Sequence, residues 1–153
     1  MDLQDYFKSI VEAVMVILMV AMGMGNASNT AAKSKYTQED VDLLAEVMYH
    51  ENWHTDSEHL AAYYTGAVVL NRVKSDKYPN TIKEVLYQKN PIQYSTTKYF
   101  YTKTIPEECY EMAKDILENG TPDVPANVVY QATFKQGSGD WIPPINGEHF
   151  CYE

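Results

Sequence analysis

The sequence of 153 residues is short of basic charge and of cysteine. It holds 12 Lys and Arg against 21 Asp and Glu, a formal net charge of −9, and its basic residues form no cluster. Because proteins that bind nucleic acids neutralise phosphates with clustered Lys and Arg, we expect no nucleic-acid partner. The two cysteines, Cys109 and Cys151, form no C-x-x-C pair, and the sequence leaves open whether they form a disulfide or stay free.

The chain also lacks an apolar run long enough to span a membrane. The run AVMVILMVAMGM, from Ala13 to Met24, falls well short of the roughly 20 residues that a spanning helix needs. Its length matches the core of an export signal, and a small-x-small site follows at residues 25–27, although the preceding residues are acidic rather than basic. We expect residues 1–36 to be a signal or membrane-anchor segment with a polar linker. The alternative is a helix that packs on the folded domain or on a partner.

The first helix of the folded part is predicted at residues 38 to 52. Thr37 and Asp40 provide an N-cap and an acidic first turn, and apolar residues then recur at helical spacing. At about 100° per residue, Glu51 falls inside the apolar arc of this helix. The residues of the arc are Val41, Leu43, Leu44, Ala45, Val47 and Met48.

The position of Glu51 predicts an unusual carboxyl group. On an apolar face near a helix C-terminus, the charged form loses solvation and meets the negative end of the helix dipole, and both effects raise the pKa. A carboxyl group that keeps its proton near neutral pH suits general acid catalysis. The alternative is a structural Glu51 that reaches solvent or pairs with Arg72.

The stretch HENWH, residues 50 to 54, matches the zinc-peptidase pattern H-E-x-x-H. That site requires His50 and His54 to lie one turn apart on a continuous helix. Thr55 and Glu58 read as a capping box that starts a new helix, which would leave His54 in a turn and His59 beyond it. We therefore expect no bound metal, with a zinc peptidase as the less favoured alternative.

The rest of the chain predicts an α+β fold that is mainly α. Further helices are expected at about 56 to 74, which is apolar nearly all round, from Thr81 to about Gln88, and between Pro106 and Gly120. Asn71 in the first of these is expected to be a buried hydrogen-bonding anchor. The inner face of the last is expected to hold Cys109, Met112, Ala113 and Ile116. Strands at 128–134 and about 148–152 would form a small C-terminal antiparallel β-hairpin.

Several motifs together resemble the spore-cortex-lytic type of cell wall hydrolase, the SleB/CwlJ-like family. The resemblance runs in order from about residue 40 to the C-terminus, and the ordered set is what makes it specific. Its parts are Glu51, AVVLNRV at 67–73, YPNTI at 78–82, VLYQ at 85–88, QYS at 93–95 and the closing GEHFC at 147–151.

The resemblance implies that residues 37–153 are a lysozyme-like, mainly helical catalytic domain that cleaves peptidoglycan glycan strands. It implies one catalytic glutamate at the end of a helix, which matches Glu51. The expected protein is a monomer without a cofactor, acting outside the cell or at the cell wall. Two departures from the family pattern stand out. The stretch after Glu51 is about two residues longer, and the closing motif is one residue shorter, so either Glu148 or His149 occupies the position of the family's histidine.

The family resemblance favours a lytic transglycosylase over a hydrolase. A hydrolase needs two carboxyl groups, whereas a lytic transglycosylase needs one, because the C6 hydroxyl of muramic acid attacks its own anomeric carbon. Asp56 and Glu58 are the candidates for a second carboxylate, although the predicted capping box already occupies Glu58. A wall-binding module without catalysis is a further alternative.

Substrate binding is expected to use aromatic rings and polar side chains. Aromatic rings stack on sugar faces, and amides or hydroxyls bind the polar groups of a sugar. The strand residue Tyr130 has core packing as its alternative role, and Trp141 has capping of the hairpin. The predicted substrate-binding residues are Gln93, Tyr94, Ser95, Tyr130, Trp141 and His149.

Overall fold

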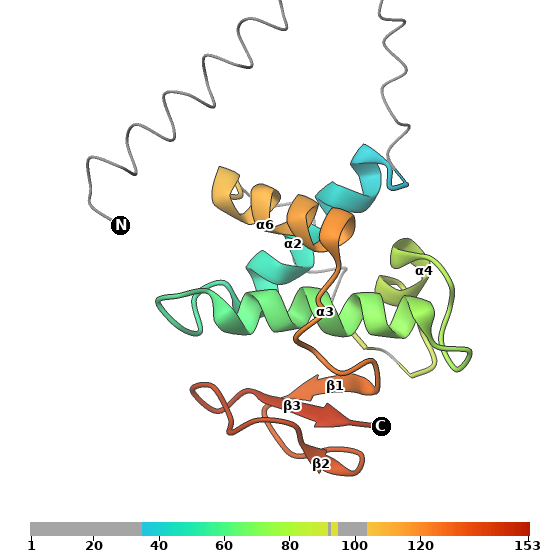
Figure 1. The fold of residues 1–153 in the computed structure, drawn as a ribbon, viewed down its shortest axis with the longest axis vertical. Helices are drawn as coiled ribbons and strands as arrows, with labels where there is room; N and C mark the ends of the chain where they lie inside the picture. Colours follow the sequence, from blue (N-terminus) through green and yellow to red (C-terminus); the bar gives the residue numbers. More distant parts are fainter. Residues whose placement is uncertain (1–34, 92, 95–103) are drawn as a thin grey trace, which may run out of the picture. The chain divides into compact units, whose positions relative to one another are not determined.

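The computed structural model describes residues 35–91, 93, 94 and 104–153. Most of the predicted signal or anchor segment, and the predicted binding residue Ser95, lie outside these ranges. Within the described ranges, no helix combines the length and the apolar character needed to cross a membrane. The helices and strands are labelled as in Figure 1.

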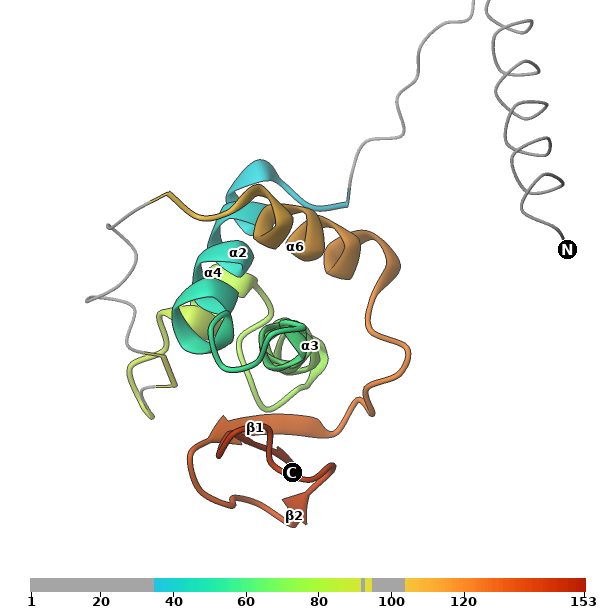
Figure 2. The same cartoon turned by 90° about the vertical axis from the view of Figure 1, so that its left-hand side faces the viewer.

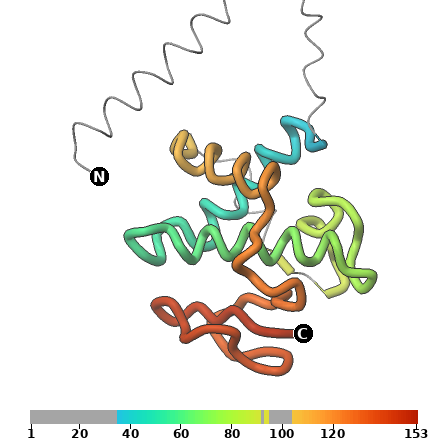
Figure 3. Tube along the Cα trace, in the orientation of Figure 1, coloured from blue at the N-terminus to red at the C-terminus, as the bar shows by residue number. Residues whose placement is uncertain are grey.

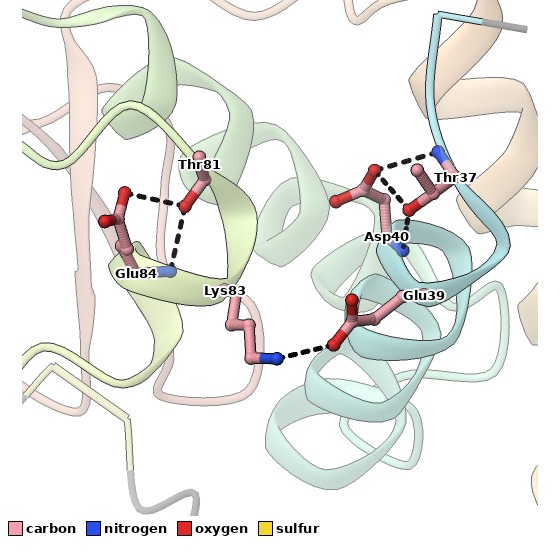
Figure 4. Close-up of polar contacts among 6 residues, drawn as sticks. All are labelled: Thr37, Glu39, Asp40, Thr81, Lys83 and Glu84. Carbon is pink, nitrogen blue, oxygen red and sulfur yellow. Dashed lines mark hydrogen bonds and ion pairs between the residues drawn. The ribbon is translucent and has the colours of Figure 1, made fainter.

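The first described helix, α2 (Gln38–Asn52), begins and ends where the sequence predicts. The Thr37 hydroxyl accepts a hydrogen bond from the Asp40 N–H at 3.2 Å, and the Asp40 carboxylate accepts one from the Thr37 N–H at 2.9 Å. This reciprocal pair satisfies backbone donors that the start of a helix leaves unpaired. Figure 4 shows this cap. It also shows the ion pair between Glu39 and Lys83, which joins α2 to a short helix further along the chain.

Helix α3 (Leu60–Lys74) is buried on most sides, as its sequence predicts. The expected role of Asn71 is confirmed, because its side-chain amide donates to the backbone carbonyls of Pro125 and Val128 at 2.9 and 3.0 Å. The small residues of α3 let neighbouring helices approach closely. A Cβ atom added at Gly66 would lie only 2.7 Å from the side-chain tip of Ile116.

The predicted start of α3 is wrong. Thr55 does not cap the helix, because its hydroxyl donates to the side chain of Asn52. Asp56 is the residue whose carboxylate accepts from the first two N–H groups of α3, at 2.8 and 2.9 Å. The helix begins only after His59, whose φ of 57° lies outside the α-helical range. Glu58 is therefore an exposed loop residue without a capping role.

Helices α4 (Ile82–Leu86) and α6 (Glu107–Asn119) lie near their predicted positions. The Thr81 hydroxyl caps α4 by accepting from the Glu84 N–H at 3.2 Å, a contact that Figure 4 also draws. Helix α4 ends two residues before the predicted Gln88. Helix α6 starts after Pro106 and ends at Asn119, with Gly120 as its C-cap, as expected. The predicted inner face of α6 is buried at Cys109, Ala113 and Ile116 and only partly buried at Met112.

The C-terminal strands form an antiparallel sheet of three strands in the order β1-β3-β2. Strands β1 (Val128–Ala132) and β3 (His149–Tyr152) correspond to the predicted hairpin. Strand β2 (Gly139–Asp140) is an addition, because its two residues carry no alternating pattern that the sequence could reveal. The α+β, mainly α class is confirmed.

Helix α3 separates the other described helices from the sheet. Figure 1 shows α2 and α6 on one side of it and the three strands on the other, and Figure 2 shows the same order with α3 seen end-on. A core between the helices includes Leu44, Met48 and Ile116, and a second core between α3 and the sheet includes Val68 and Phe150. The buried faces of α3 therefore hold both layers in place.

A tight turn leads into β3. The backbones of Ile145 and Glu148 exchange hydrogen bonds of 3.0 and 2.9 Å, while Asn146 and Gly147 between them have positive φ angles of 47° and 90°. Positive φ at both central residues, with the sequence Asn-Gly, is typical of a type I′ turn. The Asn146 side chain donates to the carbonyl of Thr55. Figure 3 shows this turn and the α2–α3 loop at the same end of α3.

Candidate active site

Glu51 lies in the last turn of α2. The residue is exposed to solvent, yet its pKa is raised, first by partial burial of the carboxyl group and second by repulsion from Glu148. Both causes penalise the ionised form. The raised pKa that the sequence predicts is confirmed, although the second cause is the charge of Glu148 rather than the helix dipole. A carboxyl group that solvent can reach and that holds its proton can donate it to a bound molecule.

Asn52, the last residue of α2, organises the polar groups beside Glu51. Its side chain is 3% exposed, accepts a hydrogen bond from the Thr55 hydroxyl at 2.8 Å and donates one to the Thr65 hydroxyl at 2.9 Å. It also makes a hydrogen bond to the Glu148 side chain. An amide has two donor hydrogens and one acceptor oxygen, so a single buried side chain can hold all three partners.

Glu148 comes from the far end of the chain, directly before β3. Successive side chains of a strand point to opposite faces, so Glu148 shares the face of the buried Phe150, which packs towards α3. The pKa of Glu148 is raised by burial, while the hydrogen bond from Asn52 and the charge of His149 lower it. The type I′ turn before β3 thus brings a second carboxyl group to the end of α2.

Tyr94 is influenced by the charges of both carboxyl groups. Only 4% of the residue is exposed, and burial raises the pKa of its hydroxyl, with Arg72 lowering it and Glu51 and Glu148 raising it further. The Arg72 guanidinium lies 5.2 Å from the centre of the Tyr94 ring, and its Nε donates to the Val129 carbonyl at 2.7 Å. Among the described residues Arg72 forms no ion pair with Glu51, which was the alternative role considered for that carboxylate.

His149 faces a different partner. Its Nδ1 lies 2.7 Å from Asp140 Oδ1. Asp140 also accepts a hydrogen bond from the Cys151 thiol and forms an ion pair with Lys135. These contacts are consistent with strand alternation, because His149 and Cys151 share the face opposite to Glu148. Of the two residues considered for the position of the family's histidine, Glu148 is the one beside Glu51. A role of His149 in substrate binding stays a prediction.

The other predicted binding residues are spread over the fold. Trp141 is partly buried, and its ring meets that of Tyr64 at 5.0 Å over the second core. Tyr130 is partly buried on β1 and hydrogen-bonds Tyr78 after α3. Gln93 is partly buried next to Tyr94. These positions fit the structural alternatives for Trp141 and Tyr130, and the predicted contacts of all three with substrate are untested.

The motif HENWH does not lie on one continuous helix. Helix α2 ends at Asn52, so His54 lies in the turn that follows, as predicted. The rings of His50 and His54 both pack edge-on against Tyr49, at 5.3 Å each, and His59 stacks on Trp53 at 3.7 Å. In the part of the chain that the structure describes, no three His, Cys, Asp or Glu side chains gather as a metal site.

Two residues of the site escape sequence reasoning. Asn52 looks like an ordinary turn residue, because neither of its neighbours Thr65 and Glu148 is close to it in sequence. Glu148 appears in the sequence as an alternative to His149, with no indication that it faces Glu51. The signal that identifies its face is Asn146-Gly147, since a type I′ turn there fixes where β3 begins and which residues share the face of Phe150.

Comparison with known proteins places the chain among enzymes named for the cell wall. Residues 56–148 match the sequence profile of the Cell Wall Hydrolase family. Two curated proteins from Bacillus cereus, each named spore cortex-lytic enzyme, are 28% identical over 145 residues, covering 83% of this chain and 54% of the relative. The chain thus spans about half the length of the curated relatives it matches.

No solved structure gives a significant match, so the likeness to lysozyme stays a prediction. The family profile covers most of the chain, including α3, α4, α6 and the turn that carries Glu148. It begins after Glu51, while the match to the curated relatives extends over more of the chain. The chain belongs to the cell wall hydrolase family.

Proposed function

We propose that this chain cleaves the glycan strands of peptidoglycan, with Glu51 as the general acid. The observation that carries the proposal is the solvent-accessible carboxyl group of Glu51, whose pKa is raised by burial and by Glu148. Perturbed carboxyl groups of this kind are typical of glycosidase active sites. The family and the relatives named spore cortex-lytic enzyme support peptidoglycan as the substrate class.

The reaction proposed first is that of a lytic transglycosylase. Glu51 donates its proton to the glycosidic oxygen, the bond from that oxygen to C1 of muramic acid breaks, and the bonding electrons leave with the oxygen. The C6 hydroxyl of the same muramic acid then attacks C1, and the ionised Glu51 accepts the hydroxyl proton. The product carries a 1,6-anhydro ring, no water is consumed, and Glu51 returns to its protonated form.

A hydrolase is the second candidate, and Glu148 is the observation that favours it. In hydrolysis a second carboxylate acts as nucleophile or activates the water that attacks C1. The candidates considered from sequence are less suitable, because Asp56 caps α3 with both oxygens and Glu58 lies in an exposed loop. Glu148, whose charge reaches Glu51, is a better second carboxylate.

The proposed substrate contacts come from several parts of the chain. Gln93 and Tyr94 come from the segment after α4, and Trp141 is partly exposed beside Tyr64. Tyr130, His149 and Ser95 complete the proposed set. Protein partners and a bound cofactor form no part of this proposal.

We propose that the protein acts outside the membrane, since peptidoglycan lies there. The apolar run at residues 13–24 supports export or anchoring, which would bring the domain to the wall. Anchoring and secretion make different predictions. A retained anchor keeps the full chain in the membrane fraction, whereas a cleaved signal releases a chain that begins near residue 28.

The nature of the released fragments tests the proposed reaction. Purified peptidoglycan is incubated with the full chain, and the soluble muropeptides are analysed by mass spectrometry, with and without a metal chelator. Fragments ending in 1,6-anhydro-muramic acid support the lytic transglycosylase, and fragments with a reducing muramic acid support the hydrolase. Chelator-sensitive release of peptides without glycan cleavage would contradict both and would favour the zinc peptidase.

A further inference from the structure

The proposed site contains a carboxyl group, Glu148, to which the lytic transglycosylase reaction assigns no role. Glu148 is fixed from two directions: its side chain hydrogen-bonds Asn52, and its backbone closes the tight turn with Ile145. The turn is itself attached to the loop after α2 through Asn146 and Thr55. A carboxyl group held in this way stays near Glu51, since Asn52 directly follows Glu51 and Thr55 lies in the same loop.

The surroundings of the two carboxyl groups are unequal. Glu51 meets only influences that favour its neutral form, namely partial burial and the charge of Glu148. Glu148 is also partly buried, but the hydrogen bond from Asn52 and the charge of His149 favour its ionised form. When two interacting carboxyl groups share one proton, the proton resides on the group whose ionised form is less stabilised. By this reasoning Glu148 ionises before Glu51.

Other titratable or charged groups near the pair come from several elements. Tyr94, on the segment after α4, is influenced by the charges of both carboxyl groups, and the Arg72 guanidinium of α3 lies 5.2 Å from the centre of the Tyr94 ring. On α2 itself, His50 adjoins Glu51 and packs against Tyr49. Among these groups Glu148 is the one whose charge acts directly on the Glu51 carboxyl group to raise its pKa.

We propose that Glu148 is a positioning residue whose negative charge, held beside Glu51 by Asn52, opposes the ionisation of Glu51. The inference rests on the proposed function, in which Glu51 donates a proton to the glycosidic oxygen. Glu148 does not transfer a proton in this scheme. It acts on the reaction through Glu51.

The sign of the expected pH effect follows from the charge. The acid works while it is protonated, so cleavage declines as the pH rises through the pKa of Glu51. The negative charge of Glu148 delays that ionisation. Removing the charge in Glu148→Gln should therefore move the alkaline limb of the pH profile to lower pH, by on the order of one pH unit. The maximal rate below the limb should change less.

The test measures muropeptide release by the full chain across pH for the wild type, Glu148→Gln, Glu148→Asp and Glu118→Gln. Glu118 is an exposed residue of α6, so the last variant removes the same charge at a remote position. The proposal predicts that the alkaline limb of the pH profile lies at lower pH in Glu148→Gln than in the wild type. In Glu148→Asp and Glu118→Gln it should lie close to its wild-type position. An unmoved limb in Glu148→Gln would overturn it. Loss of cleavage at every pH, with unchanged thermal unfolding, would overturn it as well, because Glu148 would then take part in the chemistry itself.

A titration that needs no substrate separates this inference from the proposed function. The pKa of the Glu51 carboxyl group is measured by carbon-13 NMR in the wild type and in Glu148→Gln. A lower pKa in the variant supports the charge effect even if the chain releases no muropeptides, and an equal pKa refutes it even if cleavage depends on Glu51. The proposed function itself fails if Glu51→Gln still cleaves, if the folded wild type releases nothing, or if it releases peptides without glycan cleavage.

Discussion

Asn146, in the turn before β3, donates its side-chain amide to the backbone carbonyl of Thr55, which follows α2. The two residues are 91 positions apart in the sequence. Through this bond the C-terminal strand and the first described helix hold Glu148 and Glu51 on the same side of the molecule. The candidate site therefore depends on the shape of the turn as much as on the two carboxyl groups.

Gly147 should be needed for the geometry of this turn. Its φ is +90° and a Cβ atom there would touch nothing within 4 Å, so Gly147→Ala introduces backbone strain without a clash. We expect a loss of about 1–2 kcal/mol in the free energy of unfolding, measured by urea titration. Cleavage of peptidoglycan should fall too, because the turn carries Glu148.

Gly120 provides the matched control. It has φ +74°, also with nothing within 4 Å of an added Cβ atom, but it ends α6. Gly120→Ala should lose a similar amount of stability and keep the cleavage rate of the folded enzyme. Equal loss of cleavage in both variants would show that strain at the Gly147 turn has no special connection to the site.

Asn52→Ala should destabilise the fold. The substitution leaves the hydroxyl groups of Thr55 and Thr65 and the Glu148 carboxylate without their buried partner, at a cost of about 1–3 kcal/mol. Loss of the hydrogen bond to Glu148 should also raise the pKa of that residue. Urea unfolding measures the first effect. Asn119→Ala, which removes an exposed hydrogen bond to Asp115, should change stability by less than about 0.5 kcal/mol.

Gly66 tests how closely the helices pack. An added Cβ atom would lie 2.7 Å from Ile116 Cδ1 and 3.0 Å from Met48 Sδ, and both side chains can shift. Since alanine also favours the helix by about 1 kcal/mol, Gly66→Ala should be close to neutral. Gly66→Leu should lower the free energy of unfolding by about 1–3 kcal/mol or more, because movement of the neighbouring side chains cannot make room for a leucine. Thermal unfolding of the two variants compares the predictions, and a well-tolerated leucine would mean that α3 is free to shift.

Asp140 should make the fold sensitive to acid. The hydrogen bond from His149, with further contributions from Lys135 and Cys151, lowers its pKa from 3.8 to about 2. A lowered carboxyl pKa contributes stability that is present above the ordinary value and is lost as the pH falls towards about 2. The urea midpoint should fall across that window in the wild type. In Asp140→Asn the urea midpoint should be lower than in the wild type at neutral pH and should fall less as the pH decreases. Parallel curves of midpoint against pH for the two proteins would contradict a contribution of ionised Asp140 to stability.

Local features of the chain were predictable, and long-range contacts were not. Helix α2 has its predicted ends because Thr37 and Asp40 form a cap from neighbouring residues. The start of α3 was mispredicted because the Thr55 hydroxyl goes to Asn52, a choice that depends on where Asn52 is buried. The raised pKa of Glu51 followed from helical projection, whereas the contribution of Glu148 depends on a sheet that forms far along the chain.

The measurement that tests the account most directly compares muropeptide release by the full-length wild type, Glu51→Gln and Glu46→Gln. Glu46 is a matched control, since it also lies on α2 and has a pKa raised by burial and by Asp42, away from Glu148. The account predicts that Glu51→Gln folds, sediments with peptidoglycan and releases no fragments, while Glu46→Gln cleaves like the wild type. Continued release of glycan fragments by folded Glu51→Gln would contradict the central role of Glu51.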